Sequence, residues 1–468
     1  MFHEAPRPGL SIEITSLINS PYVNHAGNLK NCYLIYQADF DEDCAHGVYI
    51  KNCRDILDSS LILQSELCYD SMHSYKNSRC AGLRSQVSES LDCFFLRDSH
   101  GCQNCFASAN LRNQKYRIFN KQYSPEGYKE EMKKWDLGSF AKYQEAKRIS
   151  EEHWKTLLPK PHMDDFSVNS SGSHYFQCKN CKECYEIWGP AEDSKFLFML
   201  SLPPIKDCYD VSAWGNNLQL SYESCAVGQD SANLKFCVES GLNAHSLDYC
   251  QFTFGGDNNF GCAGLRKGKY CILNKKYSKE KYEKLVPQIK KHMDEMPYIS
   301  EIRNSKHEIR KIIYQYGEFF PAELSAFPYN DTLAQRFFPL TKEEALTQGY
   351  KWLDEEKRTY PITQKAGDLP DHIKNALDSI LQEVIECATC GKGFRIIPME
   401  LKFLRERNFP LPRQCPFCRI DEKFSQWIKN LRVIPRTCDK CGASFTTNYT
   451  QDEAPVIYCK TCYNNEVI

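Results

Sequence analysis

One eighteen-residue segment of the sequence occurs twice. Leu111-Arg-Asn-Gln-Lys-Tyr-Arg-Ile-Phe-Asn-Lys-Gln-Tyr-Ser-Pro-Glu-Gly-Tyr128 returns 154 residues later as Leu265-Arg-Lys-Gly-Lys-Tyr-Cys-Ile-Leu-Asn-Lys-Lys-Tyr-Ser-Lys-Glu-Lys-Tyr282, and eleven of the eighteen positions are identical. Self-similarity of this kind indicates an internal duplication. We therefore expect the chain to use one architecture twice.

The cysteines ahead of each copy keep the same spacing. They lie 12, 13 and 12 residues apart at Cys68, Cys80, Cys93 and Cys105, and again at Cys225, Cys237, Cys250 and Cys262. Short apolar stretches followed by polar turn residues, repeated in this way, are typical of a solenoid. Two steps sum to 25 residues, about one coil of a three-sided parallel β-helix. Cys68 should then stack on Cys93, and Cys80 on Cys105, with their thiols inside.

Each copy should end in a helix that covers the open end of its solenoid, with Ser124 and Ser278 as N-caps. We predict a mainly β protein with two duplicated right-handed parallel β-helix (solenoid) segments, a helical connector and two small zinc-ribbon modules. A capping-box sequence at Thr341 and helical apolar spacing over 371–386 support the helices of the connector. The predicted bounds are 1–158 and 159–296 for the solenoids with their capping helices, 297–386 for the connector, and 387–436 and 437–468 for the ribbons.

The last eight cysteines form two quartets. The template Cys-x-x-Cys-Gly-x-x-Phe begins at Cys387 and at Cys438, and each copy has a second Cys-x-x-Cys pair downstream. Two intervening residues let a tight turn aim both sulfurs at one ion, and the glycine accommodates a positive φ. Four thiolates leave no open coordination position, so we expect two structural zinc ions, with iron and disulfides as the alternatives. The predicted ligands are Cys387, Cys390, Cys415 and Cys418, then Cys438, Cys441, Cys459 and Cys462. Sequential pairing is favoured because each half separately resembles a zinc ribbon, and a cross-braced pairing is the alternative.

A third cysteine group, Cys178-x-x-Cys181-x-x-Cys184, opens the second solenoid. This interval also occurs in cluster-binding ferredoxins, but the fourth ligand, which precedes a proline, is missing here. Packing at a strand edge is therefore the favoured interpretation of Cys178, Cys181 and Cys184, and a weak metal or cluster site is the alternative.

Composition bounds the class of protein. The chain has 468 residues, 25% of them charged, and we find no apolar run near the roughly 20 residues that a membrane-spanning helix needs. It starts without the basic and apolar segments of a secretory signal. The 25 cysteines, an odd number, suit reduced thiols or metal ligands better than disulfides. We expect a cytoplasmic protein with no membrane partner.

The repeated eighteen-residue segment and the cysteine quartets resemble those of uncharacterised cysteine-rich bacterial proteins with parallel β-helix repeats and C-terminal zinc ribbons. The likeness covers most of the chain, including Gly317-Glu-Phe-Phe-Pro321 and Phe338-Pro-Leu-Thr-Lys-Glu-Glu344. Because that group has no established activity, the resemblance implies the architecture only.

Function is predicted from local charge. The whole chain has a net charge of -1, but eleven Lys or Arg face four acids between Lys392 and Arg436. A four-thiolate zinc site reduces this excess of seven to about five. Nucleic acid is therefore the first predicted partner, and the expected phosphate contacts are Arg405, Arg407, Arg413, Lys429 and Arg432.

Two alternatives remain open. The solenoid face could serve as a protein-interaction scaffold, or its groove could belong to a β-helix enzyme acting on glycans or nucleic acids. We find no nucleophile elbow, P-loop, dinucleotide-binding motif or HExxH in the sequence. We therefore predict a non-catalytic protein with no identified small-molecule substrate and no catalytic residues.

Overall fold

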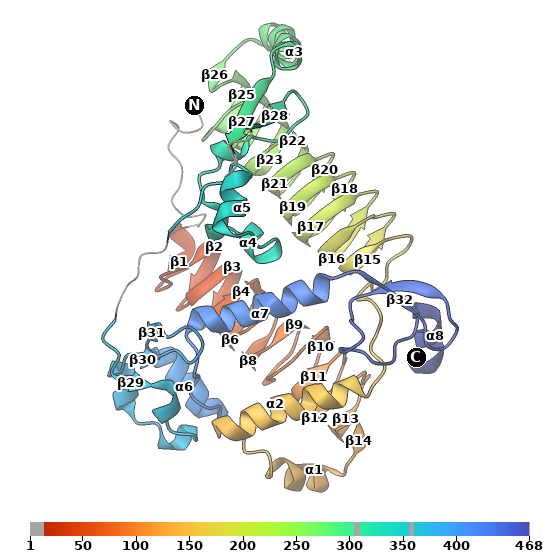
Figure 1. Ribbon diagram of the computed structural model, residues 1–468, viewed down its shortest axis with the longest axis vertical. Helices are drawn as coiled ribbons and strands as arrows, with labels where there is room; N and C mark the ends of the chain where they lie inside the picture. The colour runs from red at the N-terminus through yellow and green to blue at the C-terminus, as the bar shows by residue number, and fades with distance from the viewer. Residues whose placement is uncertain (1–13, 304–308, 355–359, 468) are drawn as a thin grey trace. The chain divides into compact units, whose positions relative to one another are not determined.

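The computed structural model describes residues 14–303, 309–354 and 360–467 (Figure 1). The chain forms two compact units. One, the first-solenoid unit, comprises Gly9–Pro161, Lys357–Trp427 and Ile434–Ile468. The other, the second-solenoid unit, comprises the described residues of His162–Glu356 and Ile428–Val433. Within each unit, stacked parallel strands dominate, so the predicted mainly β solenoid fold is confirmed.

The first solenoid rises by one coil every 12 residues in its early part. Asn24 pairs with Tyr36, and Ala45 pairs with Leu57, in parallel register. Two columns of short strands result, β4-β6-β8 and β5-β7-β9. The unit begins with a 3-10 turn, η1 (Ile14–Ser16), and its strands are β1 (Leu17–Ile18), β2 (Asn24–Lys30), β3 (Tyr33–Glu42), β4 (Ala45–Val48), β5 (Ile50–Lys51), β6 (Arg54–Leu57), β7 (Ser60–Leu63), β8 (Glu66–Tyr69), β9 (Met72–Tyr75), β10 (Val87–Ser88), β11 (Phe94–Arg97), β12 (Gln103–Ala109), β13 (Lys115–Ile118) and β14 (Lys121–Gln122).

The backbone turns into the left-handed region at every third residue through long stretches of this solenoid. Asn28, Asn31, Leu34 and Gln37 have φ values of 52°, 55°, 50° and 53°. Such values are uncommon outside glycine, and Asn and Asp tolerate them best. A coil of 12 residues therefore turns at several corners. At some corners an Asn side chain donates a hydrogen bond to an Asp side chain of the next coil.

This geometry corrects the predicted coil of 25 residues. Cys80 O accepts a hydrogen bond from Tyr69 N at 3.0 Å, and Cys93 O accepts one from Ala81 N at 3.1 Å, so consecutive cysteines of the series lie on consecutive coils. Cys68 lies beside Cys80 instead of Cys93. The prediction was wrong because each interval of 12 or 13 residues between cysteines is already one complete coil. The backbone of that coil turns at every third residue, so it does not have the three long sides of a 25-residue coil. The predicted burial of these thiols is correct.

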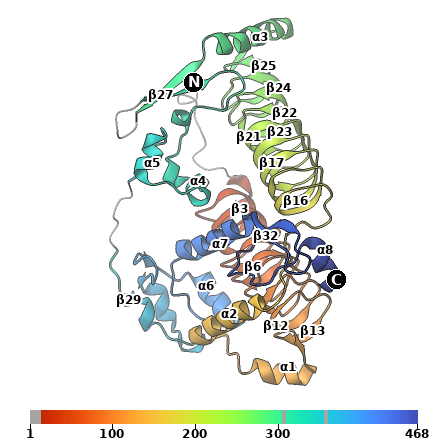
Figure 2. The ribbon, with the colours of Figure 1, turned by 45° about the vertical axis from the view of Figure 1, so that its right-hand side comes forward.

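The second solenoid repeats the arrangement with coils of 12 to 14 residues, as in the pairs Phe254–Arg266 and Lys195–Tyr209 (Figure 2). One prediction fails here: Cys225 is exposed, and the neighbouring Ser224 takes the interior position beneath Cys237. The strands are β15 (Gly172–Lys179), β16 (Cys184–Glu192), β17 (Lys195–Leu202), β18 (Ile205–Lys206), β19 (Tyr209–Gly215), β20 (Leu218–Gln219), β21 (Tyr222–Gly228), β22 (Ser231–Lys235), β23 (Val238–Asp248), β24 (Phe254–Phe260), β25 (Arg266–Ile272) and β26 (Lys275–Lys276).

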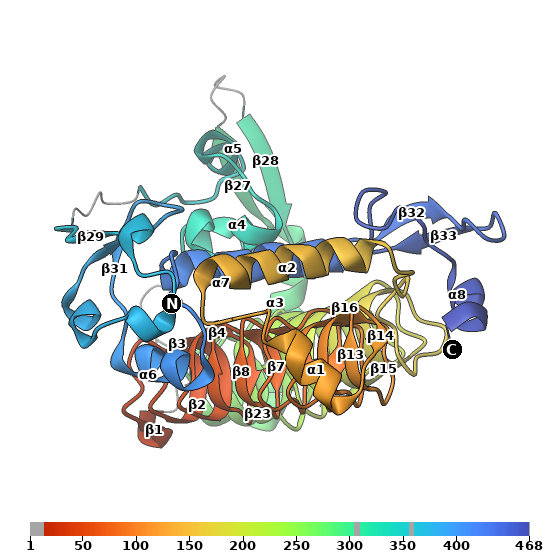
Figure 3. The ribbon, with the colours of Figure 1, turned by 90° about the horizontal axis from the view of Figure 1, so that it is seen from below.

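Both capping helices form where the sequence predicts them. Ser124 Oγ accepts from Gly127 N at 3.0 Å at the start of α1 (Pro125–Met132), beside the last strands of the first solenoid (Figure 3). Ser278 Oγ accepts from Lys281 N at 3.3 Å at the start of α3 (Lys279–Glu295). A further helix, α2 (Phe140–Lys155), packs on β11 and β12 through a buried face that includes Tyr143 and Trp154.

The predicted connector contains little helix. Thr341 and Glu344 form the expected capping box at α5 (Lys342–Thr347). Residues 371–386 do not form the predicted helix; they fold as short 3-10 turns and a strand, because their apolar side chains pack into a shared core rather than along one stripe. The elements are β27 (Tyr298–Arg303), β28 (Ile309–Tyr314), η2 (Ala322–Leu324), η3 (Tyr329–Asp331), α4 (Leu333–Phe337), α5, β29 (Gln364–Lys365), η4 (Ala366–Asp368), η5 (Ile373–Asn375), η6 (Asp378–Gln382) and β30 (Ile385–Glu386).

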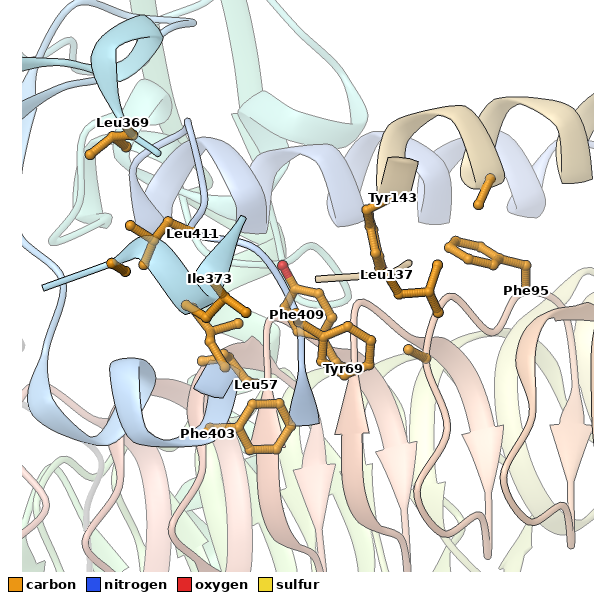
Figure 4. Packing of buried hydrophobic residues seen from close by; sticks show 14 of the residues in the cluster. Leu57, Tyr69, Phe95, Leu137, Tyr143, Leu369, Ile373, Phe403, Phe409 and Leu411 are labelled. Carbon is orange, nitrogen blue, oxygen red and sulfur yellow. The ribbon is translucent and has the colours of Figure 1, made fainter. Parts of the chain in front are cut away.

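The C-terminal region carries the two cysteine quartets on short hairpins and helices. Its elements are β31 (Gly393–Phe394), α6 (Pro398–Arg407), α7 (Pro416–Leu431), β32 (Ile434–Thr437), β33 (Ser444–Thr447) and α8 (Lys460–Val467). Leu57 and Tyr69 of the solenoid share one buried cluster with Phe403 and Phe409 of this region (Figure 4). The first cysteine module is therefore built onto the solenoid by a common core.

Candidate metal centres

The first candidate centre joins two turns with 24 residues between them in the chain. The sulfur atoms of Cys387, Cys390, Cys415 and Cys418 all lie within 4.8 Å of one another. Gly391, at φ 70°, follows the first pair, and its N–H donates to Cys387 O at 2.9 Å. This is the tight turn that the Cys-x-x-Cys-Gly sequence predicts.

The spacing of the sulfurs fits a tetrahedral ion. Cys387 Sγ and Cys418 Sγ are 3.8 Å apart, as are Cys390 Sγ and Cys415 Sγ. Four sulfurs at about 2.3 Å from one centre are separated by about 3.8 Å, whereas a disulfide requires about 2.05 Å. All eight cysteines of the two quartets are free thiols. The disulfide alternative is therefore wrong, and each quartet could hold one metal ion.

The second candidate centre repeats the first at the end of the chain. Cys438, Cys441, Cys459 and Cys462 also lie within 4.8 Å of one another, and Cys441 Sγ and Cys459 Sγ are 3.8 Å apart. Gly442 has a φ of 73°. Each quartet is made of ligands that are consecutive in the sequence, as the sequential pairing predicts.

Backbone donors favour the thiolate form in both centres. Burial by itself would raise the pKa of Cys387, but the N–H groups of Cys415 and Cys390 lower it to about 7. Cys438 is in the same situation: burial opposes ionisation, and the N–H groups of Cys459 and Cys441 lower its pKa to about 6. Because only thiolates bind a metal ion, these donors favour binding at one cysteine of each quartet, whereas burial raises the pKa of Cys415 and Cys418.

The third predicted group has a different geometry. Cys178, Cys181 and Cys184 are buried in the interior of the second solenoid, where Cys181 contacts both of the others. Across the described parts of the chain, the groups of three or more ligand atoms within 4.8 Å of one another are the two C-terminal quartets. The row of thiols is what strand-edge packing predicts.

The predicted nucleic-acid contacts are distributed over several environments. Arg405 donates to Asp378 at 2.5 Å, and Arg413 donates to Leu369 O at 2.9 Å. Arg407 is half-buried, and burial lowers its pKa. Lys429 is exposed, and its carbonyl accepts from Arg432 Nε at 2.9 Å. Part of the basic excess of this region therefore serves the fold.

Sequence reasoning missed a buried ionic network in the first-solenoid unit. Arg419 pairs with Asp58, and its Nη2 lies 2.9 Å from Glu400 Oε1. Lys423 pairs with Asp70, which also meets Arg84 at 3.0 Å. A signal was present: Arg419 and Lys423 are four residues apart on a helix, and Asp58 and Asp70 are twelve residues apart, one coil of the solenoid.

The described residues include no helix with the length and apolar character to cross a bilayer. No family model and no curated protein matches the chain. Among solved structures, the chain is similar to a putative acetyltransferase from Desulfovibrio desulfuricans G20, at 11% identity over 52% of this chain and 60% of that chain, with a TM-score of 0.12. The chain thus spans three fifths of that protein's length, and a TM-score this low carries no argument about fold or function.

Proposed function

We propose that this chain is a non-catalytic intracellular zinc-binding protein whose two ions are structural. The supporting observation is the pair of four-sulfur groups, all of whose edges are within 4.8 Å and three of which measure 3.8 Å, the edge of about 3.8 Å expected for a zinc tetrathiolate. Four thiolates fill the coordination shell, so no position remains for a substrate or an activated water. The metal then acts by holding chain segments together.

The first ion has a specific structural task under this proposal. Cys415 and Cys418 lie at the start of α7, and Arg419 follows at once. An ion bound there fixes the first turn of the helix. It thereby fixes where Arg419 and Lys423 meet the solenoid.

The spacing of the basic residues on α7 matches the spacing of the aspartates on the first solenoid. Residues four apart on a helix are separated by about 6 Å along its axis, and neighbouring coils by about 4.8 Å. Arg419 and Lys423 can therefore reach Asp58 and Asp70 on adjacent coils, because Leu57 and Tyr69 pair directly. We infer that zinc sets the register between α7 and the first solenoid.

Metal analysis of the purified chain tests the proposal. We expect about two zinc ions per chain by mass spectrometry, about one in Cys390→Ser or Cys441→Ser, and none in the double variant. Cys225→Ser is the matched control, because that thiol is exposed and lies outside both quartets. Iron in place of zinc, or no loss of metal in the double variant, would contradict the proposal.

Nucleic-acid binding through the first ribbon is a second candidate, favoured by its local excess of seven basic residues. Binding should then weaken steeply with salt, and replacing exposed Lys429 together with Arg432 by Ala should reduce the salt slope by about two. Affinity that does not change between low and high salt would exclude this candidate. A protein partner retained by the chain after removal of residues 387–468 would favour the scaffold alternative instead.

A further inference from the structure

A polar ladder runs along one corner of the first solenoid. Asn19, Asn31, Asp43 and Asp55 occupy consecutive coils, each with a left-handed φ between 45° and 55°. Asn19 Nδ2 donates to Asn31 Oδ1 at 3.0 Å, and Asn31 Nδ2 donates to Asp43 Oδ1 at 3.0 Å. The series of amide donors ends there, because the next two side chains are both carboxylates. Two like charges on adjacent coils repel each other, and Arg54 Nε, 3.7 Å from Asp55 Oδ2, supplies one counter-charge from the solvent side.

The second solenoid contains the same ladder. Asn169 donates to Asn180 and Asn180 donates to Asp193, both at 2.9 Å, and Asp207 follows on the next coil. The residues before them match as well, since Glu192 pairs with Lys206 as Glu42 pairs with Arg54. Asn169, Asn180 and Asp193 are exposed, whereas Asn31, Asp43 and Asp55 are half-buried. The two copies therefore share a backbone and differ in what covers them.

Helix α6 lies beside the first copy and forms one wall of an open pocket of about 380 Å³. The helix presents Met399, Lys402, Phe403 and Glu406, one face at helical spacing. The buried side of the cavity is apolar, with Ala45, Ile56, Leu57 and Phe403, and Tyr33 adds a half-buried ring. Asn19, Lys402 and Glu406 are exposed at its mouth. The volume lies in the range of small-molecule sites, and the pocket is open to solvent on one side.

We propose that this cavity binds a small organic cation, an ammonium group carried on an apolar or aromatic stem. Three carboxylates, those of Asp43, Asp55 and Glu406, face one ammonium group, that of Lys402, among the lining residues. Aromatic rings next to carboxylates are the usual surroundings of an organic ammonium ion. The stem lies against Phe403 and Leu57, and the charged head lies between Asp43 and Asp55.

The electrostatics of Asp55 favour a bound cation. Burial raises the pKa of Asp55, and the neighbouring Asp43 raises it further, while Arg54 and Lys402 act in the opposite direction and Glu406 reinforces the rise. An ammonium ion at this point would relieve the repulsion between the two carboxylates. Binding should therefore weaken as the pH falls, beginning above the ordinary pKa of an aspartate, about 3.9.

This inference rests on the proposed function in one respect. Helix α6 lies in the loop between Cys390 and Cys415, so the ion of the first centre holds the wall of the cavity in place. The zinc content of every sample separates the two proposals. A sample with two zinc ions and no amine binding overturns the cavity proposal alone, and a sample without zinc overturns the proposed function.

Calorimetric titration of the full zinc-loaded chain with three probes that share a phenylethyl stem tests the cavity. We expect 2-phenylethylammonium to bind at least ten-fold more tightly than neutral 2-phenylethanol, and anionic 3-phenylpropionate not to bind. Equal affinity for the amine and the alcohol overturns the proposal. So does the absence of amine binding at about 10 mM, or binding of Ca²⁺ in preference to the amine, which would assign the carboxylates to a metal ion.

The duplicated ladder supplies a matched control. Asp43→Asn and Asp55→Asn should each weaken the amine at least ten-fold, whereas Asp193→Asn and Asp207→Asn, at the same ladder positions of the second solenoid, should leave its affinity unchanged. Phe403→Leu should reduce the ratio of the affinity for the aromatic amine to the affinity for a short alkylamine. The preference for the amine over the neutral alcohol should remain. An equal effect of both Asp pairs would place the binding elsewhere and overturn the proposal.

Discussion

At the scale of single residues, burial decides how much a charged side chain contributes to stability. The side chain of Arg419 is 7% exposed and lies between two carboxylates, those of Asp58 and Glu400, whose exposed fractions are 4% and 0%. Arg405, by contrast, pairs with Asp378, which is 82% exposed. Removing one member of a buried ion pair leaves an uncompensated charge in a medium of low polarity, and removing a surface pair does not.

Arg419→Ala should therefore destabilise the first-solenoid unit by about 3–5 kcal/mol, as expected for a broken buried pair. The matched control, Arg405→Ala, should cost about 0–1 kcal/mol because its partner remains solvated. Urea unfolding of both variants, followed by circular dichroism, measures the difference. Similar losses for the two would show that Arg419 is solvated in solution.

Asp70 should make stability depend on pH. Burial opposes its ionisation, but Lys147, Lys423 and Arg84 together hold the pKa of Asp70 well below its usual value. A carboxylate with a lowered pKa stabilises the fold above the pKa of the unfolded chain, about 3.9, and this contribution disappears as the pH falls through the lower, folded value.

Unfolding experiments between pH 7 and pH 3 check this contribution. Asp70→Asn should be clearly less stable than the natural chain at pH 7, because three cations lose their partner. The gap should narrow as the pH falls below about 4. A gap that stays constant over this range would mean that Asp70 is not ionised in the folded protein.

At the scale of elements, the metal centres differ in what they organise. Cys387 and Cys415 belong to the buried cluster that also contains Leu57 and Tyr69 of the solenoid. In the second centre Cys438 is buried, Cys441 is exposed, and the other two ligands are half-buried. Loss of the first ion should therefore disturb α7 and its contacts, whereas loss of the second should act on the β32–β33 hairpin and α8.

Hydrogen exchange measured on two single variants separates these effects. Cys415→Ser should raise exchange in α7 and at the coils that carry Asp58 and Asp70, while Cys459→Ser should raise it in residues 434–467 only. The two cysteines hold the same place in their quartets, so each variant serves as the control for the other. Protection of α7 that survives loss of the first ion would show that the ion pairs alone dock the helix.

At the scale of the whole molecule, both candidate metal centres belong to one of the two compact units. Cys387 to Cys418 and Cys438 to Cys462 all lie in the first-solenoid unit. The second-solenoid unit has its own core of buried cysteine, leucine, valine and isoleucine side chains. A multidomain chain of this kind is not expected to unfold in a single step.

Differential scanning calorimetry should show two transitions. Chelation of zinc should lower the temperature of one transition by removing a ligand that binds only the folded state, and should leave the other in place. Leu247→Ala removes a buried side chain from the core of the second-solenoid unit. It should lower the temperature of the other transition, at a cost of about 2–5 kcal/mol, and leave the zinc-dependent transition in place. A single transition that shifts in both experiments would show that the units unfold together.

Local spacing determined the features that depend on neighbouring residues. The Cys-x-x-Cys-Gly turns, the caps at Ser124 and Ser278 and the capping box at Thr341 all follow from contacts within a few residues, and each is present as predicted. The duplication and the stacked parallel strands were also readable, because a solenoid repeats its local contacts along the chain.

Only the tertiary structure decided the features that depend on distant partners. The coil length required knowing which cysteine lies beside Cys68, and the orientation of Cys225 depended on whether it or Ser224 faced inward. From the sequence, Arg419 is expected to be a surface charge. In the structure it is buried and paired with Asp58, which lies 361 positions away in the sequence. Likewise, the carboxylates of Asp43 and Asp55 line a cavity only because α6 folds over them. Sequence spacing sets local geometry, whereas burial and charge pairing depend on which segments meet in space.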